Sequence, residues 1–149
     1  MRAVVQRVNS ARVTVDDRLV ATIENGLLVF VGIAREDDAT DMAYLANKIV
    51  GLRIFEDTDG RFNRSVREVE GAVLLVSQFT LYGDCRRGRR PSFGQAAPPV
   101  EARAEFAALA DTLRGHGVPV QTGEFQAHMA IESINDGPVT ILLDSGRTF

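Results

Sequence analysis

The chain has 149 residues, 45% of them hydrophobic, which predicts one globular domain spanning residues 1–149. No apolar run approaches the roughly 20 residues of a membrane-spanning helix, and the Met-Arg start does not resemble a signal peptide, so we expect no membrane association. The net charge of -3 argues against nonspecific coating of nucleic acid. The single Cys85 cannot form an intrachain disulfide, which suits the reducing cytoplasm that we expect.

The first third of the chain predicts four strands followed by a helix. Alternation of apolar and polar residues is typical of half-buried strands, whereas Gly26–Ile33 is apolar almost throughout and should be buried on both faces. Asp37 or Asp38 can cap a helix on which apolar residues recur along one face. The expected strands are Met1–Val8, Ala11–Val15, Leu19–Ile23 and Gly26–Ile33, and the helix face carries Met42, Leu45, Ala46, Ile49 and Val50.

The rest of the chain predicts a turn, another buried strand, a second long helix and three closing strands. The helix starts at Pro98-Pro99, because proline suits the first helical turn, and it ends at a glycine. These elements predict an α/β fold in which two long helices accompany a mixed sheet. The turn is Asp57-Thr58-Asp59-Gly60, the strands are Ala72–Val76, Val118–Thr122, about Ala127–Ser133 and Val139–Asp144, and the helix ends at Gly115 or Gly117 with Phe106, Leu109, Ala110 and Leu113 on one face.

Two short polar segments lie at the ends of apolar strands. Ser77-Gln78-Phe79-Thr80 follows Ala72–Val76, where N–H groups that leave the sheet become free to face an oxyanion. Asn135-Asp136-Gly137-Pro138 has the composition of a hairpin turn, and its X-Pro bond can be cis. The alternative interpretation makes the first segment an ordinary strand end with an inward-facing Phe79, and the second a turn without a function.

The densest basic stretch of the chain lies between these two segments. Arg86, Arg87, Arg89 and Arg90 surround Gly88, and Pro91-Ser92-Phe93 follows. Arginine suits bidentate contacts with phosphate, and a neighbouring aromatic ring can stack on a base. The alternative is a solvated loop, since all but one of the 17 basic residues of the chain are arginine. The functional interpretation predicts a small site beside the end of a nucleic acid.

Several common active-site patterns are missing. The only histidines, His116 and His128, have no Cys or His partner at metal-ligand spacing, so we predict no metal and no cofactor. No G-x-S-x-G elbow and no Walker A loop occurs. His116 lies between glycines at a helix end, where we expect a capping role or exposure to solvent. His128 could act as a base only if folding brought it near Ser77 or Thr80.

Taken together, these segments resemble the D-aminoacyl-tRNA deacylase family. The matching segments are Ser77–Leu81, Arg86–Phe93, Asn135–Thr140, Met1–Val8 and Leu52–Asp57, and the resemblance runs from Met1 to about Ser145. It implies a homodimer with a three-layer α/β/β fold and barrel-like strands. It also implies hydrolysis of the ester between a D-amino acid, or glycine mischarged on tRNA-Ala, and the 3′-terminal adenosine of tRNA.

The resemblance implies roles for individual residues. The segment Ser77, Gln78, Phe79 and Thr80 lines the catalytic pocket in this family. Gly137-Pro138, with a cis bond, reaches the pocket from the other subunit and rejects L-amino acids. The arginines named above are then the RNA-binding residues, and the 2′-hydroxyl of the tRNA assists the attacking water. The chain departs from the family at Gln126, where many members have glycine, which affects the adenosine side of the pocket.

The chemistry of the substrate agrees with this resemblance. An aminoacyl ester is already activated, so positioning, a few backbone donors and a water are sufficient, and no catalytic triad is required. Thr80 as a nucleophile is an alternative. Two further alternatives are a noncatalytic tRNA-binding module, and a Ser/Thr hydrolase of small esters or amides that would not need the arginines.

Overall fold

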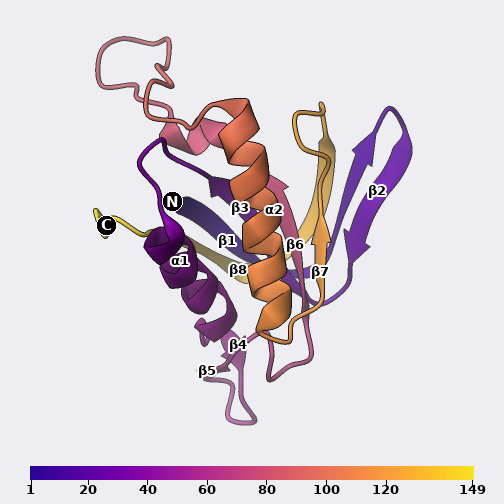
Figure 1. The fold of residues 1–149 in the computed structure, drawn as a ribbon. Helices are drawn as coiled ribbons and strands as arrows, with labels where there is room; N and C mark the ends of the chain where they lie inside the picture. The colour runs from indigo at the N-terminus through magenta and orange to yellow at the C-terminus, as the bar shows by residue number, and fades with distance from the viewer.

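The computed structural model describes residues 1–149. Six strands form one mixed sheet: β1 (Arg2–Val15), β2 (Arg18–Ile23), β3 (Gly26–Gly32), β6 (Ala72–Ser77), β7 (Val120–Thr122) and β8 (Ala130–Asp144) (Figure 1). β1 pairs antiparallel with β3 along its first half, with β2 along its second half, and with β8 on its other edge. β3, β6 and β7 run parallel to one another, so their carboxyl ends lie at the same edge of the sheet.

Two long helices cover one face of this sheet side by side (Figure 1). α1 (Ala39–Gly51) starts after Asp38, whose side chain accepts hydrogen bonds from the N–H groups of Thr40 and Asp41. α2 (Pro99–Gly115) starts with a proline and ends at Gly115, one of the two predicted ends, and His116 occupies the C-cap position. Neither helix combines the length and the apolar character needed to cross a membrane.

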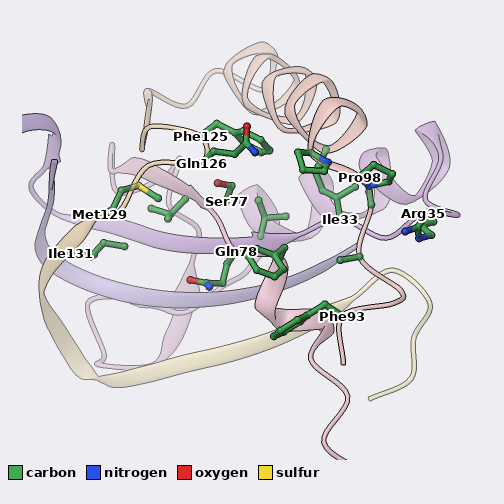
Figure 2. A pocket seen from close by; sticks show the side chains of 17 residues that line it. Ile33, Arg35, Ser77, Gln78, Phe93, Pro98, Phe125, Gln126, Met129 and Ile131 are labelled. Carbon is green, nitrogen blue, oxygen red and sulfur yellow. The ribbon is translucent and has the colours of Figure 1, made fainter. Parts of the chain in front are cut away.

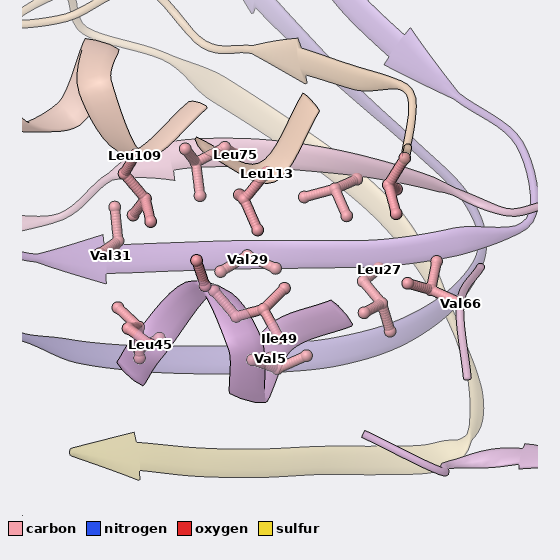
Figure 3. Close-up of a cluster of buried hydrophobic side chains, with 14 of the residues drawn as sticks. Val5, Leu27, Val29, Val31, Leu45, Ile49, Val66, Leu75, Leu109 and Leu113 are labelled. Atoms are coloured by element: carbon pink, nitrogen blue, oxygen red, sulfur yellow. The ribbon is translucent and has the colours of Figure 1, made fainter. Parts of the chain in front are cut away.

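Two apolar cores lie on the two faces of the sheet. The larger one fills the space between the sheet and the helices (Figure 3), and its fully buried members include Val5, Leu27, Val29, Leu75, Leu45, Ile49, Leu109 and Leu113. The smaller one lies where the second half of β1, together with β2, curls over the opposite face, and it contains Val8, Val13, Ile23, Leu28, Leu74 and Val76. Helices, sheet and curled strands therefore form the α/β/β layers that the resemblance implied. β3 is buried at all but one position, as predicted for a central strand.

The two strands predicted at Met1–Val8 and Ala11–Val15 are one continuous strand, β1. β8 pairs with both halves of β1, from Arg2 opposite Asp144 to Thr14 opposite Ala130. The long partner strand keeps the chain extended through Asn9 and Ser10. The polar residues that suggested an interruption therefore do not end the strand.

The prediction of a hairpin turn at Asn135–Pro138 was wrong. Both sides of this segment pair antiparallel with β1, since Gln6 lies opposite Thr140 and Val8 lies opposite Asn135. The segment is thus a bulge inside β8. The side chain of Asn135 holds it, because its amide donates to the Val139 carbonyl and its oxygen accepts from the Val139 N–H. These two bonds satisfy backbone groups that leave the ladder.

Three short elements were not predicted. β4 (Phe55–Glu56) and β5 (Phe62–Arg64) form a hairpin around the predicted turn Asp57–Gly60. η1 (Phe79–Tyr82) is a single turn of 3₁₀ helix that follows β6. Elements this short have no periodic pattern by which a sequence could reveal them. Two strand starts also shifted: β8 begins at Ala130 rather than Ala127, and β7 at Val120 rather than Val118.

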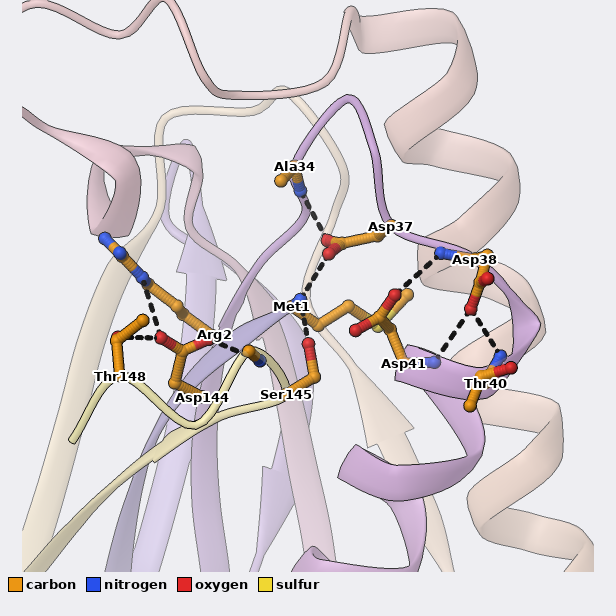
Figure 4. A network of polar contacts seen from close by, with 11 residues as sticks. Met1, Arg2, Ala34, Asp37, Asp38, Thr40, Asp41, Asp144, Ser145 and Thr148 are labelled. Atoms are coloured by element: carbon orange, nitrogen blue, oxygen red, sulfur yellow. Dashed lines mark hydrogen bonds and ion pairs between the residues drawn. The ribbon is translucent and has the colours of Figure 1, made fainter.

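A polar network joins the two ends of the chain to the loop before α1 (Figure 4). The Met1 ammonium donates to the carboxylate of Asp37 and to the hydroxyl of Ser145. The second oxygen of Asp37 accepts from the Ala34 N–H at 2.6 Å. The network therefore fixes the β3–α1 loop against the start of β1 and the end of β8.

Two carboxylates of this region have a lowered pKa. Hydrogen bonds from the Ser145 hydroxyl and the Asp38 N–H lower the pKa of Asp41. Burial alone would raise the pKa of Asp144, but hydrogen bonds from the Thr148 hydroxyl and the Gly146 N–H bring it below its ordinary value. A carboxylate with a lowered pKa stabilises the fold when ionised and loses this contribution as the pH falls.

We therefore expect the free energy of unfolding to decrease as the pH falls below about 4, the ordinary pKa of a carboxyl group in the unfolded chain. Urea unfolding at pH 7, 5, 4 and 3 measures this dependence. Asp144→Asn serves as the control, because an amide does not titrate and this variant should lose less stability on acidification. Identical pH dependence in both proteins would show that ionisation of Asp144 does not contribute to the loss of stability at low pH.

Candidate active site

A cavity of about 670 Å³ opens at the carboxyl ends of the parallel strands β3 and β6 (Figure 2). This edge is where α/β sheets commonly bind ligands. The walls come from the ends of both strands, the loop before α2, the first turns of α2 and the segment between β7 and β8. The lining is mostly apolar, and its polar side chains are Arg35, Ser77, Gln78 and Gln126. An apolar cavity with a few polar groups fits a small organic ligand or the end of a larger one.

The predicted strand end forms one wall of this cavity. β6 ends at Ser77, and the Gln78 N–H still donates to the Val31 carbonyl at 2.7 Å, so this donor is occupied. Phe79 and Thr80 then begin η1, and the first N–H groups of a helix have no acceptor within it. Of the backbone N–H donors expected around Gln78–Thr80, only those of Phe79 and Thr80 therefore remain as candidates to bind an oxyanion.

The side chains of this segment differ in where they lie. Ser77, Gln78 and Phe79 line the cavity, whereas Thr80 does not. The Thr80 hydroxyl accepts a hydrogen bond from the Gln78 amide, so Thr80 positions a residue of the wall. The interpretation of Phe79 as inward-facing was wrong, because 57% of this residue is exposed. Its ring packs edge-on against Phe93, with the ring centroids 5.0 Å apart.

Gly137 and Pro138 lie outside this cavity, on the exposed side of the bulge in β8. The bond between them is cis, and Gly137 has a φ of +140°. Arg7, which is buried, holds the bulge from β1: its Nε donates to the Asp136 carbonyl at 3.0 Å and its Nη1 donates to the Ile54 carbonyl at 2.7 Å. A single chain therefore does not bring Gly137 and Pro138 to Ser77.

The arginine-rich loop projects from the body of the fold (Figure 1). Asp84 and Ser92 close its base through two backbone hydrogen bonds. Arg86 donates to both carboxylate oxygens of Asp84, at 2.8 and 2.7 Å, and these bonds hold the pKa of Asp84 well below its usual range. The other arginines of the loop, Arg87, Arg89 and Arg90, are exposed and have no carboxylate partner, so they are the free cations of this loop.

The cavity contains no pair of a nucleophile and a base. No histidine lines it, and His128 is exposed in the segment before β8. No group of three or more His, Cys, Asp or Glu side chains is arranged to hold a metal ion.

The sequence of the whole chain matches known proteins. The profile of a family described as D-Tyr-tRNA(Tyr) deacylase matches residues 4–144. A protein of Thermotoga petrophila named D-aminoacyl-tRNA deacylase is 56% identical, and the alignment covers 100% of both chains. A protein of Heliobacterium modesticaldum with the same name is 58% identical over 97% of this chain and 96% of its own. The chain belongs to the D-aminoacyl-tRNA deacylase family.

Solved structures share the fold of this chain. A structure titled c-Myc DNA Unwinding Element Binding Protein superposes with a TM-score of 0.92 at 38% identity, covering 97% of this chain and 98% of that one. A probable eukaryotic D-amino acid tRNA deacylase superposes with a TM-score of 0.74 over 95% of this chain and 97% of its own. At 19% identity, that match shows the fold alone. The family and the fold class implied by the resemblance are confirmed.

Sequence reasoning missed Arg35, which lines the cavity of this deacylase-family chain, whereas Gln126 was named from the resemblance and does line the cavity. Arg35 follows the buried strand β3, and its Nε donates to the Gly94 carbonyl at 3.1 Å, which joins the β3–α1 loop to the loop before α2. Gln126 lines the cavity with a φ of +65°, and Arg103 of α2 donates to its amide oxygen. The position of Arg35 after a strand was a usable signal. The contact between Arg103 and Gln126 had no signal in the sequence.

Proposed function

We propose that this protein hydrolyses the ester bond between a D-amino acid and the 3′ end of tRNA, releasing both. The observation that carries this proposal is the match over the full chain to relatives named D-aminoacyl-tRNA deacylase, at 50–58% identity. The geometry supports it, because the Ser77–Phe79 segment that suggested the family lines the cavity. Since aminoacyl-tRNA is a substrate of translation, we propose that the protein acts in the cytoplasm.

The proposed chemistry uses a water molecule and backbone donors. The water adds to the ester carbonyl, the bond from the carbonyl carbon to the ribose oxygen breaks, and the ribose oxygen takes up a proton. The N–H groups of Phe79 and Thr80 are the candidate donors to the developing oxyanion, and one such donor contributes about 2.7–4 kcal/mol. The neighbouring 2′-hydroxyl of the tRNA orients the water. No side-chain base is then required, in keeping with a cavity that lacks one.

We propose that two chains build each site. Gly137 and Pro138 are exposed and lie away from the cavity of their own chain, so a second copy is the available acceptor for them. The Gly137 carbonyl of one chain then crowds one substituent position of the substrate's alpha carbon in the other. An L side chain clashes there, whereas a D side chain points toward solvent. Glycine has no side chain to reject, so we propose that glycyl-tRNA-Ala is also cleaved.

A sedimentation experiment tests the shared site. Active protein should sediment as a dimer at the concentrations used for kinetics, because a complete site needs the Gly-Pro pair of a second chain. A monomer with full activity would contradict the proposal.

Thr80→Ala should keep the single-turnover rate on D-aminoacyl-tRNA within about tenfold of the unmodified protein, since the variant loses only a hydrogen bond that positions Gln78. The backbone N–H of residue 80 remains. Mass spectrometry after rapid quenching shows whether an acyl group becomes attached to Thr80 during the reaction. A dead Thr80→Ala variant, together with an acyl group trapped on Thr80 in the unmodified protein, would replace the water mechanism by a Thr nucleophile.

We propose that the exposed arginines of the loop contact the tRNA backbone. Replacing Arg87, Arg89 and Arg90 together with alanine should weaken tRNA binding and reduce the slope of log K against log salt by about 2. Arg86→Ala should change binding less, because Asp84 already neutralises Arg86. Binding measured between 50 and 200 mM salt distinguishes these variants. Unchanged binding by the triple variant at every salt concentration would show that the loop is an ordinary solvated segment that does not contact tRNA.

One assay tests the proposed function against its alternatives. The protein is incubated with D-Tyr-tRNA, L-Tyr-tRNA and a small D-amino-acid ester, and release of the amino acid is followed. We expect rapid release from D-Tyr-tRNA alone. No release from any substrate would indicate a noncatalytic tRNA-binding module. Release from the small ester that is unaffected by loss of the arginines would indicate a small-molecule hydrolase.

A further inference from the structure

Arg35 is the only charged residue in the lining of the cavity. Figure 2 shows it at one end of the cavity, with Met129 and Ile131 at the other end. Most of the remaining lining is apolar. Moving an ion from water onto an apolar surface is unfavourable unless a group of opposite charge faces it. An anionic group of a ligand in this cavity therefore belongs beside Arg35.

Backbone pairing and one side-chain bond hold Arg35 in place. The Arg35 N–H donates to the Gln95 carbonyl at 3.1 Å, and the Ala97 N–H donates to the Ile33 carbonyl at 2.9 Å. The β3–α1 loop and the loop before α2 thus form a short antiparallel pair. The Arg35 Nε donates to the Gly94 carbonyl at 3.1 Å. A side chain that is already anchored loses less conformational freedom when it binds a ligand.

The other donors of Arg35 have no partner within the protein. Nη1 and Nη2 donate to no protein atom, the residue is exposed, and it forms no ion pair with a carboxylate. The planar guanidinium matches the oxygens of a phosphate, and hydrogen bonds between ionised groups are stronger than those between neutral ones. The bond from Nε therefore serves the fold, whereas the two Nη groups remain for a ligand.

Arg35 also lies between the cavity and the arginine-rich loop. Gly94, which it contacts, follows directly after Phe93 at the end of that loop. A polyanionic strand that leaves the cavity past Arg35 then meets the free cations of the loop, Arg87, Arg89 and Arg90. The phosphates of an RNA strand are neutralised in this way by successive basic side chains.

We propose that Arg35 binds the phosphodiester on the 5′ side of the terminal nucleoside of tRNA. The inference rests on the proposed function. The last ribose of tRNA carries the reacting ester on its 3′ side, so the phosphate nearest to the ester is the one at its 5′ position. Because that phosphate is present in every tRNA, the contact holds the substrate without distinguishing between sequences.

Binding of two nonhydrolysable ligands tests this contact. One is 3′-deoxy-3′-(D-tyrosylamido)adenosine, and the other carries in addition a methyl phosphate at its 5′ position, a diester with the single negative charge of the RNA backbone. The unmodified protein should bind the phosphorylated ligand about 10-fold more tightly, as expected for a charge-assisted hydrogen bond. In Arg35→Gln this preference should fall below about twofold. The glutamine amide has no charge but retains a donor for the Gly94 carbonyl.

Three further measurements separate phosphate binding from a role in joining the two loops. Arg35→Lys should keep a preference of about fivefold, because its ammonium still attracts a phosphate. Arg103→Gln is the matched control, since Arg103 is also exposed and forms no ion pair, and it should keep the full preference. In Arg35→Gln, KM for D-aminoacyl-tRNA should rise while kcat stays within about twofold, because the reacting groups are not touched.

Absence of a phosphate preference in the unmodified protein would overturn the inference without reference to any variant. An undiminished preference in Arg35→Gln would also overturn it, as would an equal loss in Arg103→Gln, which would show a general effect of positive charge. If the preference depends on Arg35 but no aminoacyl-tRNA is hydrolysed, the proposed function fails and the phosphate contact stands. Hydrolysis without a phosphate preference retains the proposed function and excludes the contact.

Discussion

Gly137→Ala should reduce the single-turnover rate of D-aminoacyl-tRNA hydrolysis by about 100-fold, the loss expected when a group at the reacting centre is displaced by about 1 Å. An added Cβ would lie 2.7 Å from Val139 Cγ2 and 2.9 Å from the Val139 N. Backbone atoms cannot move aside as a flexible side chain can, so the bulge must rearrange. The φ of +140° at Gly137 is in addition a conformation that only glycine adopts without strain.

Gly60→Ala is the matched control for this prediction. Gly60 also has a positive φ, +74°, but nothing lies within 4 Å of the position of its Cβ. It should lose some stability and retain its hydrolysis rate. Rapid-quench kinetics and thermal melts of both variants separate an effect on the site from an effect on the fold. A folded Gly137→Ala protein with a normal rate would exclude Gly137 from the site.

Arg7→Met should lower the free energy of unfolding by about 3 kcal/mol, because it leaves the buried Ile54 carbonyl and the partly buried Asp136 carbonyl without their donor. The residue is 5% exposed and bonds to the carbonyls of Ile54 and Asp136, with the Asp136 carboxylate at 3.1 Å from Nε. These contacts join β1 to the bulge and to the segment before β4. The same substitution should reduce hydrolysis, since the bulge that carries Gly137 loses its support.

The matched control is Arg12→Met on the same strand. Arg12 forms an ion pair with Glu132, at 2.7 Å, but both side chains are more than half exposed. Exposed ion pairs contribute little to stability, so this variant should unfold at nearly the same urea concentration as the unmodified protein. Equal destabilisation by the two substitutions would show that burial of Arg7 does not set the strength of its contacts.

The long elements of this fold could be predicted because their patterns are local. The apolar spacing of Leu45 and Ile49 gave the first helix, and Asp38 supplied its cap. The apolar run in β3 gave a central strand. Each of these signals is contained within a few residues of one element, so no knowledge of distant partners was needed.

The bulge in β8 could not be predicted, because its identity depends on a strand far away in the sequence. Asn135-Asp136-Gly137-Pro138 is equally suited to a hairpin, and only pairing of both flanks with β1 excludes the reversal. The cavity has the same property. Its wall at Ser77 was predicted from the strand end, and the resemblance indicated Gln126, but Arg35 comes from another loop that meets this wall only after folding.

One role predicted for the arginine loop changed because the composition of the loop does not show that Asp84 lies next to Arg86. Arg86 looked equivalent to Arg89 in the sequence, yet Asp84 lies two residues before Arg86 and binds the Nε–Nη2 edge of its guanidinium through both carboxylate oxygens. An acidic residue close in sequence to a basic cluster was a usable signal. It distinguishes a cation that is already paired from those available to phosphate.

The most direct test of the central claim, that each site joins the cavity of one chain to the Gly137–Pro138 pair of another, is complementation between two inactive variants. Gly137→Ala keeps the cavity, whereas Ala102→Trp fills it, because Ala102 lines its wall. Each variant alone should hydrolyse D-Tyr-tRNA at about 1% of the normal rate or below. In a co-expressed, statistically mixed population, half of the dimers are heterodimers with one complete site of two, so about a quarter of the normal activity should return. A mixture as inactive as its two parents would contradict the claim.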